Sequence, residues 1–454
     1  MKIRRYDRIN SMDKSQLNKL IDSIDFTETG TQMYHLMSEL YPICRSITGD
    51  GVRRTLKMIQ SIIPLEVKEV PTGTQVFDWK IPKEWNIEDA WIKNSKGDKI
   101  VDFKKSNLHV LNYSSPVKKR VTLKELKEHL FSIPEHPDWI PYRTSYYQEN
   151  WGFCVSHNQL GELKDELFDV YIGSSLSDGY LTFGEFYLRG ESPDEVLIST
   201  HICHPSLCND NLSGIVLSAI LGRHLSKVSL KYSYRFLFIP GTIGSITWLS
   251  LNEKSASRIK HGLVVACVGD SGNFTYKKTR GGSAEIDKIV KYALNRSAKD
   301  FSDIDFFPYG YDERQYCSPG FNLPVGCLMR TPHGEYPEYH TSADNLEFVK
   351  PENMATSLSL YLNVINILEK NKIYMNQNPM CEPQLGKRGL YQHIGGHADS
   401  KKFQLALLWT LNLSDGHNSL LDISERSGLD FRLIAEAADI LVAKDLLKEH
   451  KILT

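Results

Sequence analysis

HICHPSLCNDNLSG, residues 201–214, joins a strand-like run to a helical run, and the rest of the chain is interpreted from it. Before it stands EVLIST (195–200), an apolar run with β-branched residues, and after it comes IVLSAILGRHL (215–225), with apolar residues at helical spacing. Two histidines, two cysteines and an acid therefore lie on a strand-to-helix loop. Loops of this kind, aimed by a rigid sheet edge, carry function more often than packing.

Length and composition indicate a multidomain globular protein. The chain has 454 residues, which is too many for one ordinary core, and 41% of them are hydrophobic and 24% charged. A net charge of -1 gives no electrostatic reason to expect nucleic acid as the main partner. The 8 cysteines form no CxxC motif and are interpreted as reduced thiols.

The sequence also predicts where the protein resides. No apolar run approaches the roughly 18–20 residues of a membrane span, and the N-terminal residues lack the apolar core of a secretion signal. We therefore expect a cytoplasmic protein without a membrane partner. Assembly into a homo-oligomer is left open.

Four segments with different textures predict the domain organisation. Residues 1–64 form N-terminal helices of the catalytic domain, 65–135 a β-rich inserted domain, 136–378 the catalytic domain and 379–454 a winged-helix-like C-terminal domain. In the catalytic domain, short apolar strands alternate with helices, which predicts an α/β fold with a mainly parallel sheet flanked by helices.

Two further segments have alternative interpretations. The aromatic-rich stretch at 136–156, HPDWIPYRTSYYQENWGFCVS, is most simply a packing layer, and the alternative is a substrate-pocket lining. In the tail, the second helix of the helix-turn-helix pattern carries Asp430, Glu436 and Asp439, which match a phosphate-facing helix poorly. We therefore expect packing or protein interaction there, and no nucleic-acid partner.

Four residues from separate loops form a candidate metal-ligand set. His201 ends one strand, Asp210 precedes the next helix, Asp270 ends the run HGLVVACVGD and His340 lies in EYHTSADNL. In a doubly wound sheet the carboxyl ends of the strands converge on one crevice, so these side chains are expected to meet there. Histidine and carboxylate ligands with an open position for water are what metal-assisted hydrolysis requires.

These motifs resemble the co-catalytic zinc aminopeptidases, the family of the bacterial leucyl aminopeptidases. NDNLSG matches the segment with the bridging aspartate at Asp210, HTSAD matches the segment of the last histidine at His340, and His201 and Asp270 match the remaining ligands of the first metal. HICHPS, PGTIGS, DERQYCSPG, the β-rich insertion and the tail together resemble a bacterial aminopeptidase-like group associated with polysaccharide biosynthesis. The resemblance implies a zinc exopeptidase-like fold.

The chain departs from that family at three positions. Gly241 and Thr242 stand where the family has two adjacent glutamates, the general base and a ligand of the second zinc, and Cys203 replaces an acid that orients the first histidine. One zinc ion is therefore expected, and a second is left open. Glu313 is the leading substitute base and Asp312 the runner-up.

Each candidate also has an ordinary structural explanation. His204 is an additional metal-ligand candidate three residues from His201, although Pro205 can turn it outward. The alternatives for the others are a backbone-bonded loop histidine at His201, a helix N-terminal acid at Asp210, a simple turn at Asp270 and an exposed ion pair at Glu313.

The sequence thus predicts a zinc-dependent hydrolase of aminopeptidase type that cleaves an amide of a small peptide or aminoacyl-like substrate. Two alternatives remain. One is a catalytically degenerate metal-binding scaffold whose tail binds a partner or DNA, because both glutamates are missing. The other is an amidohydrolase acting on a glycan precursor.

Overall fold

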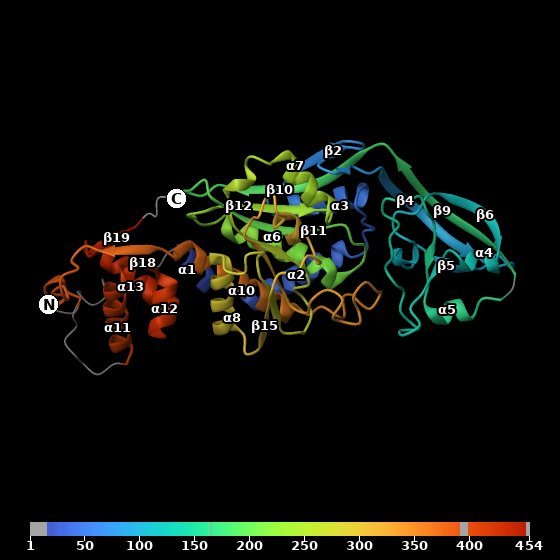
Figure 1. Cartoon of the computed structure of the whole chain (residues 1–454). Coiled ribbons are helices and arrows are strands. Elements are labelled where there is room, and N and C mark those ends of the chain that lie inside the picture. The colour runs from blue at the N-terminus through green and yellow to red at the C-terminus, as the bar shows by residue number, and fades with distance from the viewer. Residues whose placement is uncertain (1–15, 165, 391–397, 451–454) are drawn as a thin grey trace. The chain divides into compact units, whose positions relative to one another are not determined.

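A computed structural model describes residues 16–164, 166–390 and 398–450 (Figure 1). The chain divides into two compact units. The larger comprises residues 24–360, and the smaller combines the described residues up to 23 with those from 361 onward.

The larger unit is built on an eight-stranded sheet. Its order is β1 (Glu66–Pro71), β10 (Tyr180–Leu188), β12 (Ser233–Ile239), β11 (Glu195–His201), β13 (Ile259–Val265), β16 (Val325–Met329), β14 (Phe274–Lys277) and β15 (Phe301–Ile304). The four strands β12, β11, β13 and β16 run parallel to one another, while β1, β10 and β14 add antiparallel pairings. The sheet is therefore parallel at its centre and mixed at its edges.

Helices cover this sheet, as expected for parallel strands. They are α2 (Phe26–Leu40), α3 (Asp50–Gln60), α6 (Gly214–Leu225), α7 (Ile243–Leu251), α8 (Glu285–Ser297) and the short α9 (Glu313–Tyr316) and η3 (Ala256–Arg258). α6 packs on β11, β12 and β13, and α8 packs on β13, β14 and β16. α10 (Pro351–Lys370) spans the division between the two units.

β11 and α6 bring the decisive stretch to the sheet edge. Every residue of β11 is buried, and its last residue, His201, pairs with Ile239 at the end of β12. A π-type turn, η2 (Cys208–Ser213), then leads into α6. Gly214 begins that helix where a Cβ atom would lie 2.4 Å from the carbonyl oxygen of Val265. Glycine is therefore required for the helix to start against the end of β13.

A second sheet in the larger unit contains β5 (Lys99–Asp102), β4 (Glu84–Lys93), β9 (Leu167–Ser177) and β6 (Val117–Thr122), all antiparallel and with its own apolar core. Smaller elements complete this region: hairpin β2 (Gln75–Val76) and β3 (Trp79–Lys80), β7 (Leu130–Phe131), β8 (Phe153–Cys154), α4 (Leu123–Lys127), α5 (His157–Gly161) and η1 (Asn107–His109). The second sheet takes β9 from beyond the predicted boundary at 135, whereas β1 belongs to the large sheet.

The smaller unit contains α1 (Gln16–Ser23), η4 (Gly386–Arg388), α11 (Ala398–Leu413), α12 (Leu420–Ser427), α13 (Phe431–Ala443) and a sheet of β18 (Asp415–Ser419), β17 (Ile373–Asn376) and β19 (Leu447–Glu449). An ion pair of 3.2 Å joins Asp22 of α1 to Arg432 of α13. α1 thus groups with this unit and not with the predicted catalytic segment 1–64, and β17 precedes the predicted start at 379.

None of the helices within the described residues combines the length and the apolar character that a membrane crossing requires.

Candidate metal centre

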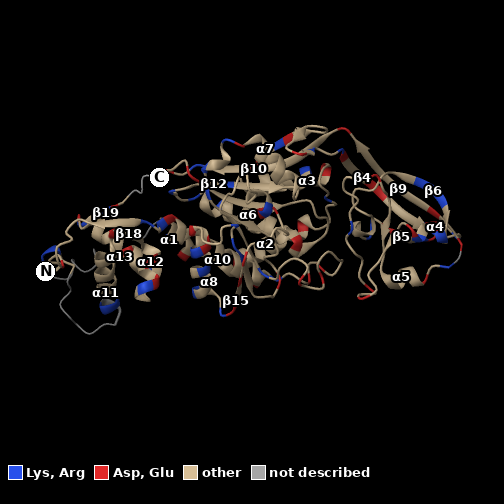
Figure 2. Cartoon of the chain, viewed as in Figure 1, with Lys and Arg blue, Asp and Glu red and all other residues tan. Residues whose placement is uncertain are grey.

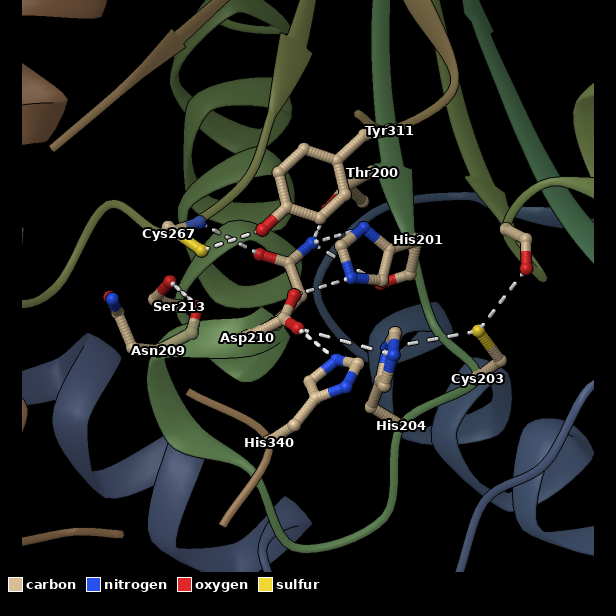
Figure 3. A network of polar contacts seen from close by, with 12 residues as sticks. Thr200, His201, Cys203, His204, Asn209, Asp210, Ser213, Cys267, Tyr311 and His340 are labelled. Atoms are coloured by element: carbon tan, nitrogen blue, oxygen red, sulfur yellow. Dashed lines mark hydrogen bonds and ion pairs between the residues drawn. The ribbon is translucent and has the colours of Figure 1, made fainter. Parts of the chain in front are cut away.

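Asp210 is the centre of a group of histidines at the carboxyl end of the parallel strands (Figure 3). Its Oδ1 lies 2.8 Å from Nε2 of His201, and its Oδ2 lies 2.9 Å from Nε2 of His340. His201 comes from the end of β11, Asp210 from η2 and His340 from a loop 130 positions later. The structure therefore brings these three predicted ligands together.

His204 joins the same group. Its Nε2 lies 4.0 Å from Oδ2 of Asp210. One ligand atom from each of His201, His204 and Asp210 lies within 4.8 Å of the other two. The three side chains, from the end of β11 and the loop that follows it, are therefore close enough together to hold a metal ion.

Burial and charge act against each other at this group. Burial disfavours the charged carboxylate of Asp210, but His204 and His201 more than offset this, and the pKa of Asp210 lies well below its ordinary value. Burial lowers the pKa of His204 well below its ordinary value, although Asp210 opposes the shift. An ionised carboxylate and a neutral imidazole are the forms that bind a metal ion.

Asp344 holds the loop that carries Asp210. Its two carboxylate oxygens accept hydrogen bonds from the backbone N–H groups of Asn209, at 2.6 Å, and Asp210, at 2.9 Å. Burial raises the pKa of Asp344 to about 8, against these two hydrogen bonds. Asp344 is therefore a support for the ligand loop.

Asn211 and Tyr142 also contact the ligands, and both were missed from the sequence. The amide Nδ2 of Asn211 lies 3.3 Å from Nδ1 of His201 and donates to Oγ1 of Thr200 at 2.9 Å. The ring of Tyr142 packs edge-on against His204 and His340, with centroids 5.1 and 5.0 Å apart. The repeated asparagine in NDN and the aromatic-rich stretch were the available signals.

Arg45 positions the loop of His204 from behind. The guanidinium is fully buried, and its Nε donates to the carbonyl oxygen of His204 at 2.8 Å. Its Nη1 donates to the carbonyl oxygen of Leu40 at 2.8 Å. Nothing in the sequence around Arg45 signals this role, because the contact joins segments 159 positions apart.

Asp270 lies apart from the group, contrary to the predicted ligand set. Its Oδ1 accepts hydrogen bonds from Thr331 Oγ1 and the Gly272 N–H, both at 2.6 Å, and its Oδ2 accepts one from Asn209 Nδ2 at 2.9 Å. The run HGLVVACVGD is not strand to its end, because β13 stops at Val265. The chain turns before it reaches Asp270, and the carboxylate of Asp270 connects neighbouring loops through these hydrogen bonds.

Glu313, the leading base candidate, forms an ion pair with Lys277. Its Oε1 lies 2.8 Å from the Nζ of Lys277, and each side chain is only 1% exposed. The Nζ also donates to the carbonyl oxygen of Tyr309 at 2.7 Å. A strong electrostatic partner therefore already occupies one oxygen of this carboxylate.

Asp312, the runner-up, lies next to Gly241. A Cβ atom on Gly241 would lie 3.3 Å from Oδ2 of Asp312 and 3.1 Å from Cβ of His201. Oδ1 of Asp312 accepts a hydrogen bond from Ser245 Oγ at 2.7 Å, whereas its buried Oδ2 has no hydrogen-bond partner among the described residues. Burial raises the pKa of Asp312 to about 6. An ordinary side chain at 241 would compete with this carboxylate for space.

The donors of the group fit zinc. Two imidazole nitrogens and one carboxylate oxygen are a common ligand set for catalytic zinc, which leaves a fourth position for water. His201 and Asp210 are buried, whereas 16% of the His204 side chain is exposed. The residues therefore match the ion that the sequence predicts.

Comparisons with known proteins give relatives for both units. The model of a domain of unknown function, DUF4910, matches residues 34–371, and a winged helix-turn-helix model matches residues 372–449. A Clostridium acetobutylicum protein, described as a candidate polysaccharide biosynthesis protein with an aminopeptidase-like domain, is 55% identical over 433 residues. These are 95% of this chain and 99% of that protein.

Solved structures show the same fold. A crystal structure of a candidate peptidase from Clostridium acetobutylicum has a TM-score of 0.90 and 54% identity, covering 95% of this chain and 99% of that chain. BSAP, a zinc aminopeptidase from Bacillus subtilis, has a TM-score of 0.55 and 13% identity, covering 75% and 95%. The predicted aminopeptidase-like α/β fold and the winged-helix-like C-terminal module are confirmed.

Proposed function

The chain belongs to the DUF4910 family, and from that premise we propose that it is a zinc-dependent amide hydrolase of aminopeptidase type. The observation that carries this proposal is the convergence of His201, His204 and Asp210, with His340 against the same carboxylate. The likeness in fold to a zinc aminopeptidase supports it.

The ligand group gives each residue a task. His201, His204 and Asp210 would hold a zinc ion, which when bound would supply Lewis-acid activation of the amide carbonyl and of the attacking water. His340 holds the second oxygen of Asp210, and Asp344 fixes the backbone beneath it. These contacts orient the ligands before substrate arrives, which preserves the geometry that hydrolysis requires.

We assign the proton transfer to Asp312 in preference to Glu313. Both carboxylates have one buried oxygen without a hydrogen-bond partner among the described residues, but only that of Asp312 lies beside Gly241, 3.3 Å from a Cβ atom placed there, which is the position where the similar aminopeptidase family carries its base. This carboxylate accepts a proton from the attacking water and returns it to the leaving nitrogen as the C–N bond breaks. Glu313 is held by Lys277.

One assay on the full-length protein tests the proposal. Zinc content is measured after purification in zinc-containing buffer, together with amine release from a panel of aminoacyl amides. Asp210→Asn is expected to lose zinc and turnover. Asp312→Asn is expected to keep zinc and lose turnover by at least about 100-fold. The exposed Asp178→Asn serves as the matched control. Zinc-free wild-type protein would refute the proposal.

A second candidate function is a metal-binding scaffold without catalysis. The absence of carboxylates at Gly241 and Thr242 favours it, because a glycine accepts no proton and a threonine is a poor zinc ligand. Bound zinc without amine release from any amide of the panel would support the scaffold.

The substrate is the remaining part of the proposal. A small peptide or aminoacyl amide follows from the resemblance. The relative described in terms of polysaccharide biosynthesis supports the other predicted class, an amide on a glycan precursor. The cytoplasm remains the proposed compartment.

A further inference from the structure

Four aromatic side chains pack as two pairs, each with one ring on the same hairpin, and we term them the aromatic patch: Phe77, Trp79, Tyr147 and Phe321. The first three are 47%, 44% and 50% exposed. Phe77 and Trp79 lie on the β2–β3 hairpin. The rings of Trp79 and Tyr147 have centroids 5.4 Å apart, and those of Phe77 and Phe321 are 5.8 Å apart. Rings that pack against each other this closely, yet remain half exposed, present a surface on which a ligand can lie.

The patch is connected to the ligand group by one short segment. Tyr142 packs against His204 and His340, and its backbone N–H donates to the carbonyl oxygen of His340 at 2.7 Å. The hydroxyl oxygens of Tyr142 and Tyr146 lie 2.9 Å apart, and Tyr147 follows directly. Five residues span at most about 18 Å, which limits the distance between the Cα atoms of Tyr142 and Tyr147. A ligand of a few linked rings covers that distance.

Two of the four aromatic residues have an unfavourable backbone conformation. Phe77 has a φ of 51° and Tyr147 a φ of 66°, in the left-handed region that bulky residues avoid. Phe77 is also the first residue of the two-residue turn between Val76 and Trp79, where a positive φ favours glycine. Strain of this kind gathers at ligand-binding positions, where the side chain is needed in place of a more stable residue.

The neighbours of these rings indicate the class of ligand. Exposed polar side chains lie next to the aromatic ones in both segments: Asp78 and Lys80 alternate with Phe77 and Trp79, and Gln148 and Glu149 follow Tyr147. A sugar ring has a C–H face that stacks on an aromatic ring and a hydroxyl edge that hydrogen-bonds to such polar groups. An apolar peptide side chain instead favours an enclosed, mostly apolar pocket.

We propose that the aromatic patch binds the saccharide part of a substrate whose amide lies at the His201–Asp210 group. This inference rests on the proposed amide hydrolase and selects a glycan-type substrate for it. Saccharide rings stack on Trp79 and Tyr147, and the exposed polar side chains that follow Tyr147, Gln148 and Glu149, hydrogen-bond to the hydroxyl groups.

Isothermal titration of the full-length protein with chitotriose, an oligomer of N-acetylated amino sugar, tests the patch. The wild type is expected to bind it, and Trp79→Ala and Phe77→Gly are each expected to weaken binding at least tenfold. Phe77→Gly also removes the backbone strain, so its melting temperature is expected to stay or rise. A merely structural role for Phe77 predicts a lower melting temperature with unchanged binding.

Tyr187→Ala is the matched control. Tyr187 is 40% exposed, and on the sheet it pairs with Arg235. Arg235 lies four positions before Ile239, the strand partner of His201. Loss of the Tyr187 ring is therefore expected to leave binding unchanged. No binding by the wild type, binding that Trp79→Ala leaves intact, or equal binding of trileucine would overturn the patch. Zinc content and amine release are measured on the same samples. If the protein contains no zinc but its chitotriose binding depends on Trp79, only the proposed hydrolase activity is refuted. If the protein is active but its chitotriose binding does not depend on Trp79, only the proposed role of the aromatic patch is refuted.

Discussion

At the scale of single residues, the ion pair of Lys277 and Glu313 has a measurable role in stability. Both side chains are buried, so Glu313→Gln leaves an uncompensated buried ammonium. The free energy of unfolding is expected to fall by about 3 kcal/mol, with zinc content unchanged. Urea denaturation measures the stability. The double variant Glu313→Leu with Lys277→Met is expected to recover most of the loss, and a fully stable Glu313→Gln would contradict the prediction.

Asp312 predicts a pH dependence of stability. Burial raises its pKa from 3.8 to about 6 in the folded protein. A raised folded pKa means that the carboxyl contributes stability below pH 3.8 and that this contribution is lost as pH rises through about 6. Two pKa units correspond to about 3 kcal/mol. Asp312→Asn cannot ionise, so urea denaturation at pH 4 to 7 is expected to show the variant gaining on the wild type. A constant difference would contradict the assigned pKa.

How well the sequence predicted each metal ligand depended on where that residue lies in the chain. His201 and Asp210 lie within one loop, so their spacing alone placed them together. Asp270 was assigned to a strand end because apolar residues continue past Val265, although the chain leaves the sheet there. The role of Arg45 could not be predicted from the sequence, because it depends on a hydrogen bond to a carbonyl group that is distant in the chain.

At the scale of elements, Gly214 sets the start of α6 against β13. In Gly214→Ala the new Cβ would lie 2.4 Å from a backbone oxygen, so the helix must shift. Unfolding free energy is expected to fall by at least about 2 kcal/mol. Gly320→Ala is the control, because no atom lies within 4 Å of its added Cβ and φ is not positive. Equal stability of the two variants would show that the helix start can relax.

The elements with the strongest patterns were predicted best. β11 and α6 have continuous apolar character because they are buried on all sides, and this pattern appears directly in the sequence. The boundaries of the second sheet were predicted less accurately, because the sequence of β9 resembles that of any other strand and does not show which strands pair with it. Strand pairing depends on tertiary contacts that no local pattern contains.

At the scale of the whole molecule, the winged-helix unit provides a test of partners. Glu436 and Asp439 are exposed on α13, and acidic and basic side chains are interspersed along this unit (Figure 2). We expect no binding of a labelled 20-base-pair duplex at 150 mM salt by fluorescence anisotropy. Replacing both acids with lysine is expected to create weak, salt-dependent binding. Tight wild-type binding with a steep salt dependence would contradict this.

The order of motifs in the sequence was enough to predict the overall architecture. It was not enough to predict which distant segments fold into the same unit. α1 belongs with the C-terminal unit because Asp22 pairs with Arg432, a contact across 410 positions. Only the folded chain reveals a pairing of that separation.

Asp344 has a consequence for metal exchange. It lies four residues after His340 and accepts a hydrogen bond from the backbone of Asp210. Protein contacts alone therefore hold together two segments that are 134 positions apart in the chain. The ligand cage is assembled by folding and not by the ion, unlike a zinc finger, which unfolds when its metal is removed. Chelation should therefore yield an intact apoprotein that accepts a new cation at once, which makes the site suitable for replacing zinc with a spectroscopically visible metal such as cobalt.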